Sequence, residues 1–382
     1  MDELTDAPTE DEFELSIFGA GVGEALAIHV GGGQWGFVDS FRDPVSSEPV
    51  GLRYMKDLGV STQDVGFILA THWHDDHIDG LAEMVEEFPE AMFGCSSAYT
   101  GKDFTAVTLE YPPDFKTSGV QEMRRCFELV ESGAKPGSPR PTPKRILEHQ
   151  NVWWSPDDAV VVHALAPTSG ALSRAEQDII NHLLPDAQRR RSLGRLKPNQ
   201  ASIVLNVWMP EDSVLLGGDL EERGSAGTGW SGVVARFPSS YPRSSVFKVP
   251  HHGSAGAHFD GQWTTLLYEE PAPFAAVTSF ASSDLPRDGD LRRLLHLAQA
   301  VYQCGVTPTQ PLELTGPERR RLAVDGIELE AARGVGQVRL RKKLGSSETW
   351  QITLAGDARQ ITEADLSSPK RAPRRRGKRR RR

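Results

Sequence analysis

The sequence predicts an α/β fold, and three strand-like stretches support that prediction. Residues 65–70, 213–216 and 245–249 are short, mainly apolar runs bounded by turn residues, which is the pattern of buried strands. Each run is followed closely by side chains that can bind a metal, and the first leads into apolar residues at helical spacing. Open α/β sheets carry their functional sites at the carboxyl ends of strands. We therefore expect a metal site at that edge of a sheet.

The remaining elements follow in order along the chain. Residues 12–40 predict two or three strands, and the glycines within 19–23 indicate a hairpin, because a strand rather than a dinucleotide-binding helix comes next. Apolar residues recur at helical spacing after Gly80, so a helix is expected from about Asp79. Further along, the pattern predicts a long insertion at 96–150, an amphipathic helix at 171–185, a helix at 290–305 and a closing hairpin at 337–356.

Both ends of the chain are predicted to be disordered. Residues 1–11 are acidic, and residues 366–382 end in a block of like charge with proline and glycine that cannot pack into a core. The folded domain is expected to span residues 12–365.

The stretch ATHWHDDHIDG, residues 70–80, concentrates metal-binding side chains. It holds three histidines and three aspartates, whereas the whole chain of 382 residues has 11 histidines. Imidazole nitrogens together with carboxylate oxygens suit zinc, manganese or iron, and the absence of a nearby cysteine argues against a closed thiolate zinc site. The alternative is a solvated polar loop with Asp79 as a helix cap. That alternative accounts for one aspartate and leaves the histidines unexplained.

Two later strands supply the further ligands that a metal site needs. The strand beginning at residue 213 leads into Gly217-Gly218-Asp219, and the strand beginning at residue 245 leads into His251 and His252. A Gly-Asp pair after a strand is by itself more often a turn. The three motifs together, each at a strand end, predict a metal centre.

With these motifs identified, residues 12–360 resemble a metallo-β-lactamase-fold metallohydrolase. Thr71 to Gly80 matches the H-x-H-x-D-H signature of that superfamily, and Asp39 in WGFVDSF matches its early strand-end aspartate. The stretches KPNQASIVLNV, LLGGD and VPHHGS look like the branch that includes the hydrolase domain of bacterial DNA-uptake channel proteins. The resemblance implies a four-layered αββα sandwich with long insertions and a disordered basic C-terminal tail.

The chain departs from that branch at two places. His74 stands where the branch often has an aspartate, which restores the general superfamily pattern. No clear Gly-His third-motif ligand precedes Asp219. His163 is the only candidate, and its position in the middle of a strand favours a core histidine, or one that orients a ligand, over a ligand.

Carried over position by position, the resemblance implies two adjacent divalent transition-metal ions, with zinc preferred and manganese or iron as alternatives. The implied ligands are His72 and His74 for the first ion, Asp76 and His77 for the second, Asp219 as a bridge, and His251 to complete the second. Asp39 would orient a ligand histidine through its other ring nitrogen, and Asp75 would lie outside the ligand set.

The ions would supply a nucleophilic water at neutral pH, so no serine or cysteine nucleophile is needed. Asp76 and His252 are the candidate catalytic side chains; His252 would protonate the leaving group, with a capping or ligand-orienting role as the alternative. The candidate substrate contacts are Asn199, Ser202, Gly253 and Ser254.

Composition points to a compartment and to one class of partner. No stretch approaches twenty apolar residues, and the acidic start lacks a signal segment, so we expect neither a membrane span nor secretion. Cys95, Cys126 and Cys304 are odd in number and unclustered, which indicates a reducing compartment and a cytoplasmic protein. The sequence leaves the oligomeric state open.

Charge is unevenly distributed along the chain. The net charge is −9, yet residues 370–382 hold ten basic residues; without them, 33 basic residues stand against 52 acidic ones, or −19. This tail and the basic segment 189–197 predict contact with nucleic acid. A solubilising tail, or one that folds back on the acidic body, is the alternative.

Three functions therefore stay open. The first is a dinuclear metal-dependent phosphodiesterase or nuclease, favoured by the DNA-uptake-type motifs and the basic segments. The second is a hydrolase of a small ester, thioester or lactone on the same metal centre, which the acidic body would suit better. The third is a non-catalytic binding module, against which the intact ligand set argues. One metal centre serves many reactions on one scaffold, so the fold alone does not choose among them.

Overall fold

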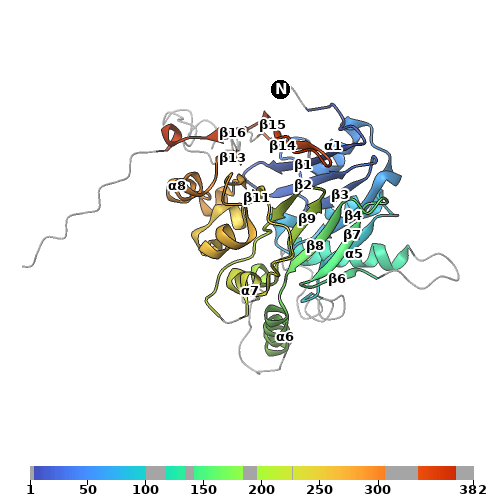
Figure 1. The fold of residues 1–382 in the computed structure, drawn as a ribbon. Helices are drawn as coiled ribbons and strands as arrows, with labels where there is room; N and C mark the ends of the chain where they lie inside the picture. Colours follow the sequence, from blue (N-terminus) through green and yellow to red (C-terminus); the bar gives the residue numbers. More distant parts are fainter. Residues whose placement is uncertain are drawn as a thin grey trace, which may run out of the picture.

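Two eight-stranded sheets form the centre of the molecule (Figure 1). The computed structural model describes residues 4–99, 118–133, 142–183, 196–225, 227–305 and 334–366. The first sheet has the order β15-β14-β1-β2-β3-β4-β5-β6, and the second has the order β16-β13-β12-β11-β10-β9-β8-β7.

The strands of the first sheet are β1 Glu12–Gly19, β2 Glu24–Val30, β3 Trp35–Val38, β4 Val65–Ala70, β5 Met92–Ser96, β6 Lys144–Ile146, β14 Gly336–Lys343 and β15 Gln351–Gly356. The strands of the second sheet are β7 Gln150–Trp154, β8 Val161–Ala166, β9 Val204–Met209, β10 Asp212–Leu216, β11 Val246–Lys248, β12 Phe274–Thr278, β13 Ala300–Cys304 and β16 Ala358–Ile361.

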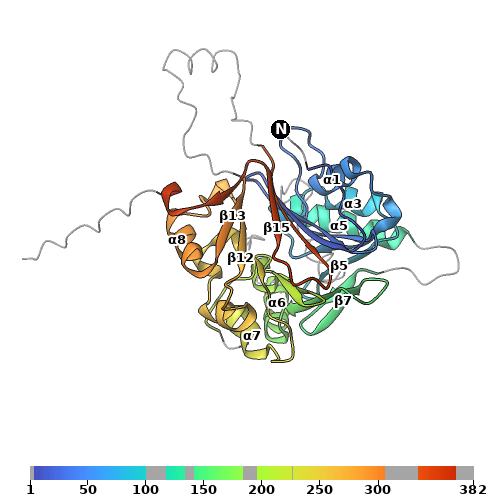
Figure 2. The ribbon, with the colours of Figure 1, turned by 45° about the horizontal axis from the view of Figure 1, so that its top comes forward.

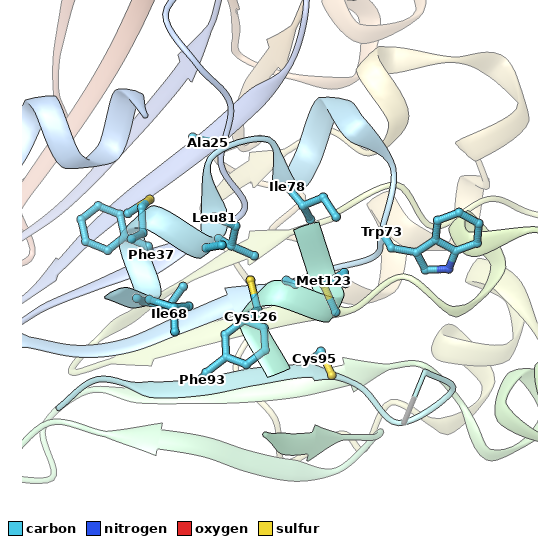
Figure 3. Packing of buried hydrophobic residues seen from close by; sticks show 14 of the residues in the cluster. Ala25, Phe37, Ile68, Trp73, Ile78, Leu81, Phe93, Cys95, Met123 and Cys126 are labelled. Atoms are coloured by element: carbon cyan, nitrogen blue, oxygen red, sulfur yellow. The ribbon is translucent and has the colours of Figure 1, made fainter. Parts of the chain in front are cut away.

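Three apolar cores join these sheets and their helices into four layers. The core between the sheets takes residues from both, such as Leu15 of β1 and Val162 of β8. A second core packs the other face of the first sheet against helices, and Figure 3 shows Ile68 of the sheet beside Leu81 and Met123 of the helices. A third core packs the second sheet against its own helices through residues such as Trp230.

The helices lie on the two outer faces of the sandwich. Figure 2 shows α1 (Val50–Leu58), α3 (Leu81–Glu87) and α5 (Ser118–Ser132) together on one side, and α7 (Gly229–Arg236) and α8 (Asp288–Leu297) on the other. The prediction of a four-layered αββα sandwich is confirmed.

The middle strands of both sheets run parallel where the predicted motifs lie. β3 to β6 are parallel neighbours in the first sheet, and β10 to β13 are parallel neighbours in the second. The residues that follow β3 and β4 therefore lie at one edge of the first sheet, and those that follow β10 and β11 lie at one edge of the second. These are the segments that carry the predicted ligands.

Several predicted elements are confirmed within the described residues. The strands at the start of the chain and the hairpin of β14 and β15 form as expected. The amphipathic helix predicted at 171–185 is α6, which spans Ser169–Leu183.

Two predicted helices differ from the structure at their ends. The helix expected from about Asp79 is α3, which begins at Leu81 after Gly80 takes a left-handed φ of 83°. A separate short helix, α2 (Asp75–Ile78), precedes it, and Asp79 pairs with Arg42 and does not cap α3. The helix expected over 290–305 ends at Leu297, and the apolar run after it is strand β13. A short apolar run fits a buried strand as well as a helix, so periodicity alone does not separate the two.

The described part of 96–150 is not a structureless insertion. It contains α5, which packs on α3, and β6, which extends the first sheet. Buried Met123 and Cys126 of α5 join the core on that face (Figure 3). Residues 100–117 and 134–141 lie outside the described residues.

The N-terminal segment also differs from its prediction. Residues 4–11 were expected to be disordered, but they lie against the first sheet. The Asp6 carboxylate forms ion pairs with two residues of β14, Arg339 at 2.9 Å and Arg341 at 2.8 Å. Most of the basic segment 189–197, and the tail from residue 367, lie outside the described residues. None of the helices in the described ranges is long and apolar enough to cross a membrane.

Candidate metal centre

The predicted ligands from the two sheets meet at one edge of the sandwich. Within the described residues, two groups of side chains place their ligand atoms within 4.8 Å of one another: His72, His74 and Asp219 form one group, and Glu24, His77, Asp219 and His252 form the other. Asp219 belongs to both groups. We call the side with His72 and His74 the first subsite, and the side with Asp76, His77 and His252 the second subsite.

Asp219 lies between the subsites with each carboxylate oxygen facing a different histidine. Its Oδ2 is 3.9 Å from His72 Nε2, and its Oδ1 is 3.2 Å from His77 Nε2. The turn before it requires glycine: Gly218 has a φ of 49°, and a Cβ there would lie 2.5 Å from the Ile203 carbonyl oxygen. The LLGGD stretch therefore folds so that a buried carboxylate projects between two histidines.

His252 joins Asp76 and His77 in the second subsite. Asp76 Oδ2 lies 3.1 Å from His252 Nε2 and 3.7 Å from His77 Nε2. The His252 ring is fully buried and stacks on Phe280, with the ring centroids 4.9 Å apart. This buried position places His252 among the candidate ligands of the second subsite; its proposed role in protonating a leaving group stays a prediction.

His251 lies beside the first subsite and not in the second, where it was expected. Its Nε2 is 3.9 Å from Asp219 Oδ2, the oxygen that His72 also approaches, and it accepts a hydrogen bond from Asn199 Nδ2 at 3.4 Å. The cause is the turn: His251 and His252 both have left-handed φ angles, 48° and 51°, and Gly253 follows at 79°. This backbone turns the two rings apart, with centroids 6.3 Å from each other.

Asp39, which is buried just after β3, holds His77 and Thr71 in place. Its Oδ2 lies 2.7 Å from His77 Nδ1 and accepts a hydrogen bond of 2.7 Å from Thr71 Oγ1. The Thr71 backbone N–H donates to the other carboxylate oxygen at 2.7 Å. The carboxylate thus directs His77 Nε2 toward Asp219.

Burial and carboxylates together set the protonation of the metal-free centre. Burial lowers the pKa of His72 well below its ordinary value. Burial acts the same way on His77, but the carboxylates around it, Asp219 foremost, outweigh burial and raise its pKa well above the ordinary value. Burial raises the pKa of Asp219, yet the neighbouring histidines, led by His77, hold it well below the ordinary value. In the metal-free protein, a proton on His77 therefore stabilises the negative charges of the surrounding carboxylates.

The arrangement fits the binding of divalent metal ions. Within the described part of the chain, His77 Nε2 and Asp219 Oδ1 are buried without a hydrogen-bond partner. These two atoms face each other at 3.2 Å, so a divalent ion that displaces the proton of His77 would be bound by both. The imidazole and carboxylate donors match the preference of zinc, manganese and iron.

The structure places Asp75 and His163 away from the two subsites. The exposed Asp75 accepts a hydrogen bond of 2.6 Å from Gly119 N in the first turn of α5. His163 is buried on β8, where it stacks on Trp208 with centroids 4.4 Å apart and its Nδ1 lies 2.5 Å from Asn151 Oδ1. Burial lowers the pKa of His163 to about 4. It is a core histidine and does not orient a ligand.

Three of the four predicted substrate contacts, Ser202, Gly253 and Ser254, form hydrogen bonds within the protein. Ser202 is fully buried, and its hydroxyl accepts a hydrogen bond from Asp219 N at 3.0 Å. The Gly253 N–H donates to the Pro250 carbonyl, and the Ser254 hydroxyl accepts from Gly256 N at 3.3 Å. These groups shape the turns that hold the ligands. Asn199 does lie at the centre, through its contact with His251.

Sequence reasoning missed three buried residues behind the second subsite. Glu24 begins β2, Lys248 ends β11 and Thr278 ends β12, and all three are within 1% of full burial. The signal was present in the sequence: Glu24 and Lys248 are opposite charges within apolar strands, and such charges are buried only when they are paired.

Comparisons with known proteins give two local sequence matches and distant structural ones. No family model matches the sequence. Hydroxyacylglutathione hydrolases from two strains of Vibrio cholerae serotype O1 are each 50% identical to this chain over 48 residues, which are 13% of this chain and 18% of theirs. The chain thus covers less than a fifth of the length of the curated relatives it matches.

Similar solved structures include metallo-β-lactamases. The enzyme SMB-1 bound to 2-mercaptoethanesulfonate has a TM-score of 0.32 at 14% identity, over 66% of this chain and 84% of that one. A metallo-β-lactamase from Cronobacter sakazakii has a TM-score of 0.31 at 14% identity, over 60% of this chain and 76% of that one.

Within the chain itself, two facing sheets, outer helices and ligand motifs at one edge form the four-layered αββα sandwich that the sequence predicts.

Proposed function

We propose that this protein is a metal-dependent hydrolase that binds two divalent ions, one in each subsite. The observation that supports this most directly is Asp219, whose two carboxylate oxygens face His72 and His77 separately. Two ions held there would provide a nucleophilic water at neutral pH and stabilise the negative charge that develops on the substrate.

In this proposal the side chains of the two subsites bind the ions, and their neighbours orient those side chains. His72, His74 and Asp219 would hold the first ion, with His251 beside them in place of the absent third-motif histidine. Asp76, His77, His252 and Asp219 would hold the second ion. Asp39 fixes His77 through its Nδ1, and Ser202 fixes the main chain of Asp219. Such outer contacts keep each ligand atom aimed at its ion.

For the substrate, we propose a phosphodiester, and nucleic acid in particular. Two basic segments support it: ten basic residues at 370–382 and the run RRRSLGRLK at 189–197. A polyanion would be drawn to such segments, whereas the body of the chain is acidic.

A thioester is the second candidate substrate class. One specific observation favours it, the 50% identity over 48 residues to hydroxyacylglutathione hydrolases. The acidic body would also repel a small neutral or singly charged thioester less than it would repel a nucleic acid.

An activity panel on the full chain, loaded with zinc or manganese, tests the proposal. The substrates are single-stranded DNA, duplex DNA, RNA, a phosphodiester dye, a glutathione thioester and a lactone, and the control is the Asp219→Asn protein. We expect turnover of the phosphodiesters by the wild type and its loss in the control. Turnover of the thioester alone would reverse the order of the two substrate classes. A wild-type protein that holds two ions yet hydrolyses nothing in the panel would overturn the hydrolase proposal.

A further inference from the structure

A buried polar network lies behind the second subsite. Lys248 Nζ forms an ion pair with Glu24 Oε1, and Thr278 Oγ1 donates a hydrogen bond of 2.6 Å to Glu24 Oε2. His252 Nδ1 lies 3.0 Å from the same Thr278 hydroxyl. The network therefore runs from a lysine through a carboxylate and a hydroxyl to the remote nitrogen of a candidate metal ligand.

The direction of these hydrogen bonds determines where His252 carries its proton. A carboxylate paired with a lysine only accepts, so Thr278 must donate its single hydroxyl hydrogen to Glu24. The Thr278 oxygen is then an acceptor, and His252 Nδ1 must be the N–H that donates to it. This leaves His252 Nε2, 3.1 Å from Asp76 Oδ2, as the nitrogen that faces the subsite.

The first subsite contains the same arrangement, built from different strands. Thr71 Oγ1 donates to Asp39 Oδ2 at 2.7 Å and lies 3.0 Å from His72 Nδ1. A carboxylate, a threonine hydroxyl and a histidine Nδ1 thus follow one another on both sides of Asp219. We call each such series of hydrogen bonds, from a carboxylate through a threonine hydroxyl to a histidine Nδ1, a threonine relay. Its recurrence indicates that it sets the orientation and tautomer of one ligand histidine in each subsite.

The relay of the second subsite differs from that of the first because its carboxylate, Glu24, is paired with Lys248. Glu24 Oε1 lies 3.7 Å from His77 Nδ1, and Glu24 Oε2 lies 3.8 Å from His252 Nδ1, so this carboxylate is close enough to compete for a cation. Pairing with fully buried Lys248 offsets its charge. Glu24 comes from the first sheet and Lys248 from the second, four residues before His252, so the pair also ties the two halves of the centre together.

We propose that Glu24, Lys248 and Thr278 are positioning residues that hold His252 with Nδ1 protonated and Nε2 directed to the second metal ion. The proposal rests on the proposed function for the presence of that ion. Glu24 itself stays outside the ligand set, because its oxygens are engaged by Lys248 and Thr278.

Metal titration of the full-length Thr278→Val protein tests this relay, because valine keeps the shape of threonine and removes only the hydroxyl. Zinc affinity is measured for each subsite by chelator competition, and cobalt absorption reports the ligand geometry. We expect the second-subsite affinity to fall about 10- to 100-fold, the usual effect of removing a hydrogen bond that supports a metal ligand, with the first subsite unchanged. Thr278→Ser should restore both affinity and spectrum, and Glu24→Gln combined with Lys248→Met should reproduce the weaker binding.

Thr168→Val is the matched control, since Thr168 is a buried threonine whose hydroxyl donates to the Gly227 carbonyl at 2.7 Å. It should bind both ions like the wild type. Wild-type affinity and spectrum in Thr278→Val would overturn the proposal.

If Thr278→Val does not fold, imidazole nitrogen chemical shifts of the zinc-loaded wild type decide the matter: an Nδ1–H tautomer for His252 supports the relay, and an Nε2–H tautomer refutes it. These readouts need no substrate, so a protein that binds two ions but hydrolyses nothing would overturn only the proposed function.

Discussion

His251 and His252 are consecutive in the chain, yet their Nε2 atoms contact different carboxylates. His251 Nε2 lies 3.9 Å from Asp219 Oδ2, whereas His252 Nε2 lies 3.1 Å from Asp76 Oδ2. Two left-handed residues in a row, neither of them glycine, produce this divergence. Such backbone is unfavourable for a histidine and persists where the surroundings hold it, which is common at functional sites.

The first prediction separates the roles of these two histidines by double-mutant analysis. His252→Ala and Asp76→Ala should each remove the second ion, so the double variant should still retain about one ion per chain. His251→Ala should weaken metal binding at the first subsite, so combining it with Asp76→Ala should bring the metal content close to zero. Residues that share a site are non-additive, and those at separate sites add. Elemental analysis after zinc loading measures the content; the reverse pattern would exchange the two assignments.

The second prediction concerns the carboxylate between the subsites. Asp219→Asn should preserve the fold, because an amide has the same shape, but an amide is a poor bridging ligand. We expect the metal content to fall below one ion per chain and turnover to fall by at least about 100-fold, which corresponds to roughly 2.7 kcal/mol of transition-state stabilisation. Circular dichroism checks the fold, and two ions retained in the variant would contradict the bridging role.

The third prediction concerns His163, which the sequence favours as a core histidine over a ligand. Its ring is buried and stacked on Trp208, so His163→Ala should lower the free energy of unfolding by about 2–3 kcal/mol through the cavity left behind. Metal content and turnover should stay at the wild-type level. Thermal unfolding and elemental analysis measure the two effects. Loss of an ion with an unchanged melting temperature would instead identify His163 as the missing third-motif ligand.

The fourth prediction follows from the raised pKa of His77. The carboxylates around His77 keep it protonated in the metal-free fold above the ordinary value of about 6.5, so metal binding must displace that proton. His72, whose pKa burial lowers, has no such proton to release. We therefore expect zinc binding at pH 7 to release about one proton, and zinc affinity to rise with pH until the His77 pKa is passed. Calorimetry in buffers of different ionisation enthalpy counts the protons, and a count of zero would contradict the protonated state of His77.

The local sequence patterns predicted the α/β class and the ligand-bearing loops because those features are local, whereas the four-layered sandwich was predicted from the resemblance to a known superfamily. The buried strand before His72 and the paired glycines before Asp219 are each visible in fewer than ten consecutive residues. The division of roles between His251 and His252 was not predictable in this way. It depends on two successive left-handed φ angles, which remain uncommon for histidine even though histidine adopts them more often than most residues do.

The network behind the second subsite was missed for a related reason. Glu24 and Lys248 are 224 positions apart and meet only when the two sheets pack face to face. Asp39 was identified because it matches the early strand-end aspartate of the superfamily that the sequence resembles, whereas none of the recognised motifs contains Glu24. Contacts between sheets depend on how the sheets pack, and the strand pattern of either sheet does not contain that information.

The last prediction tests the proposed nucleic-acid contact of the basic tail. If KRAPRRRGKRRRR touches phosphates, deletion of residues 370–382 should weaken binding and flatten its salt dependence. Each phosphate interaction that the deletion removes should reduce the log–log salt slope by roughly 0.7 for single strands or 0.9 for duplex, so five of them would change it by about 3.5 to 4.5. Turnover of a small phosphodiester dye should stay the same, because the proposed metal ligands all lie before residue 253. Equal salt slopes with and without the tail would remove the tail's support for a nucleic-acid substrate. The thioester, which the local identity to hydroxyacylglutathione hydrolases favours, would then become the leading substrate class.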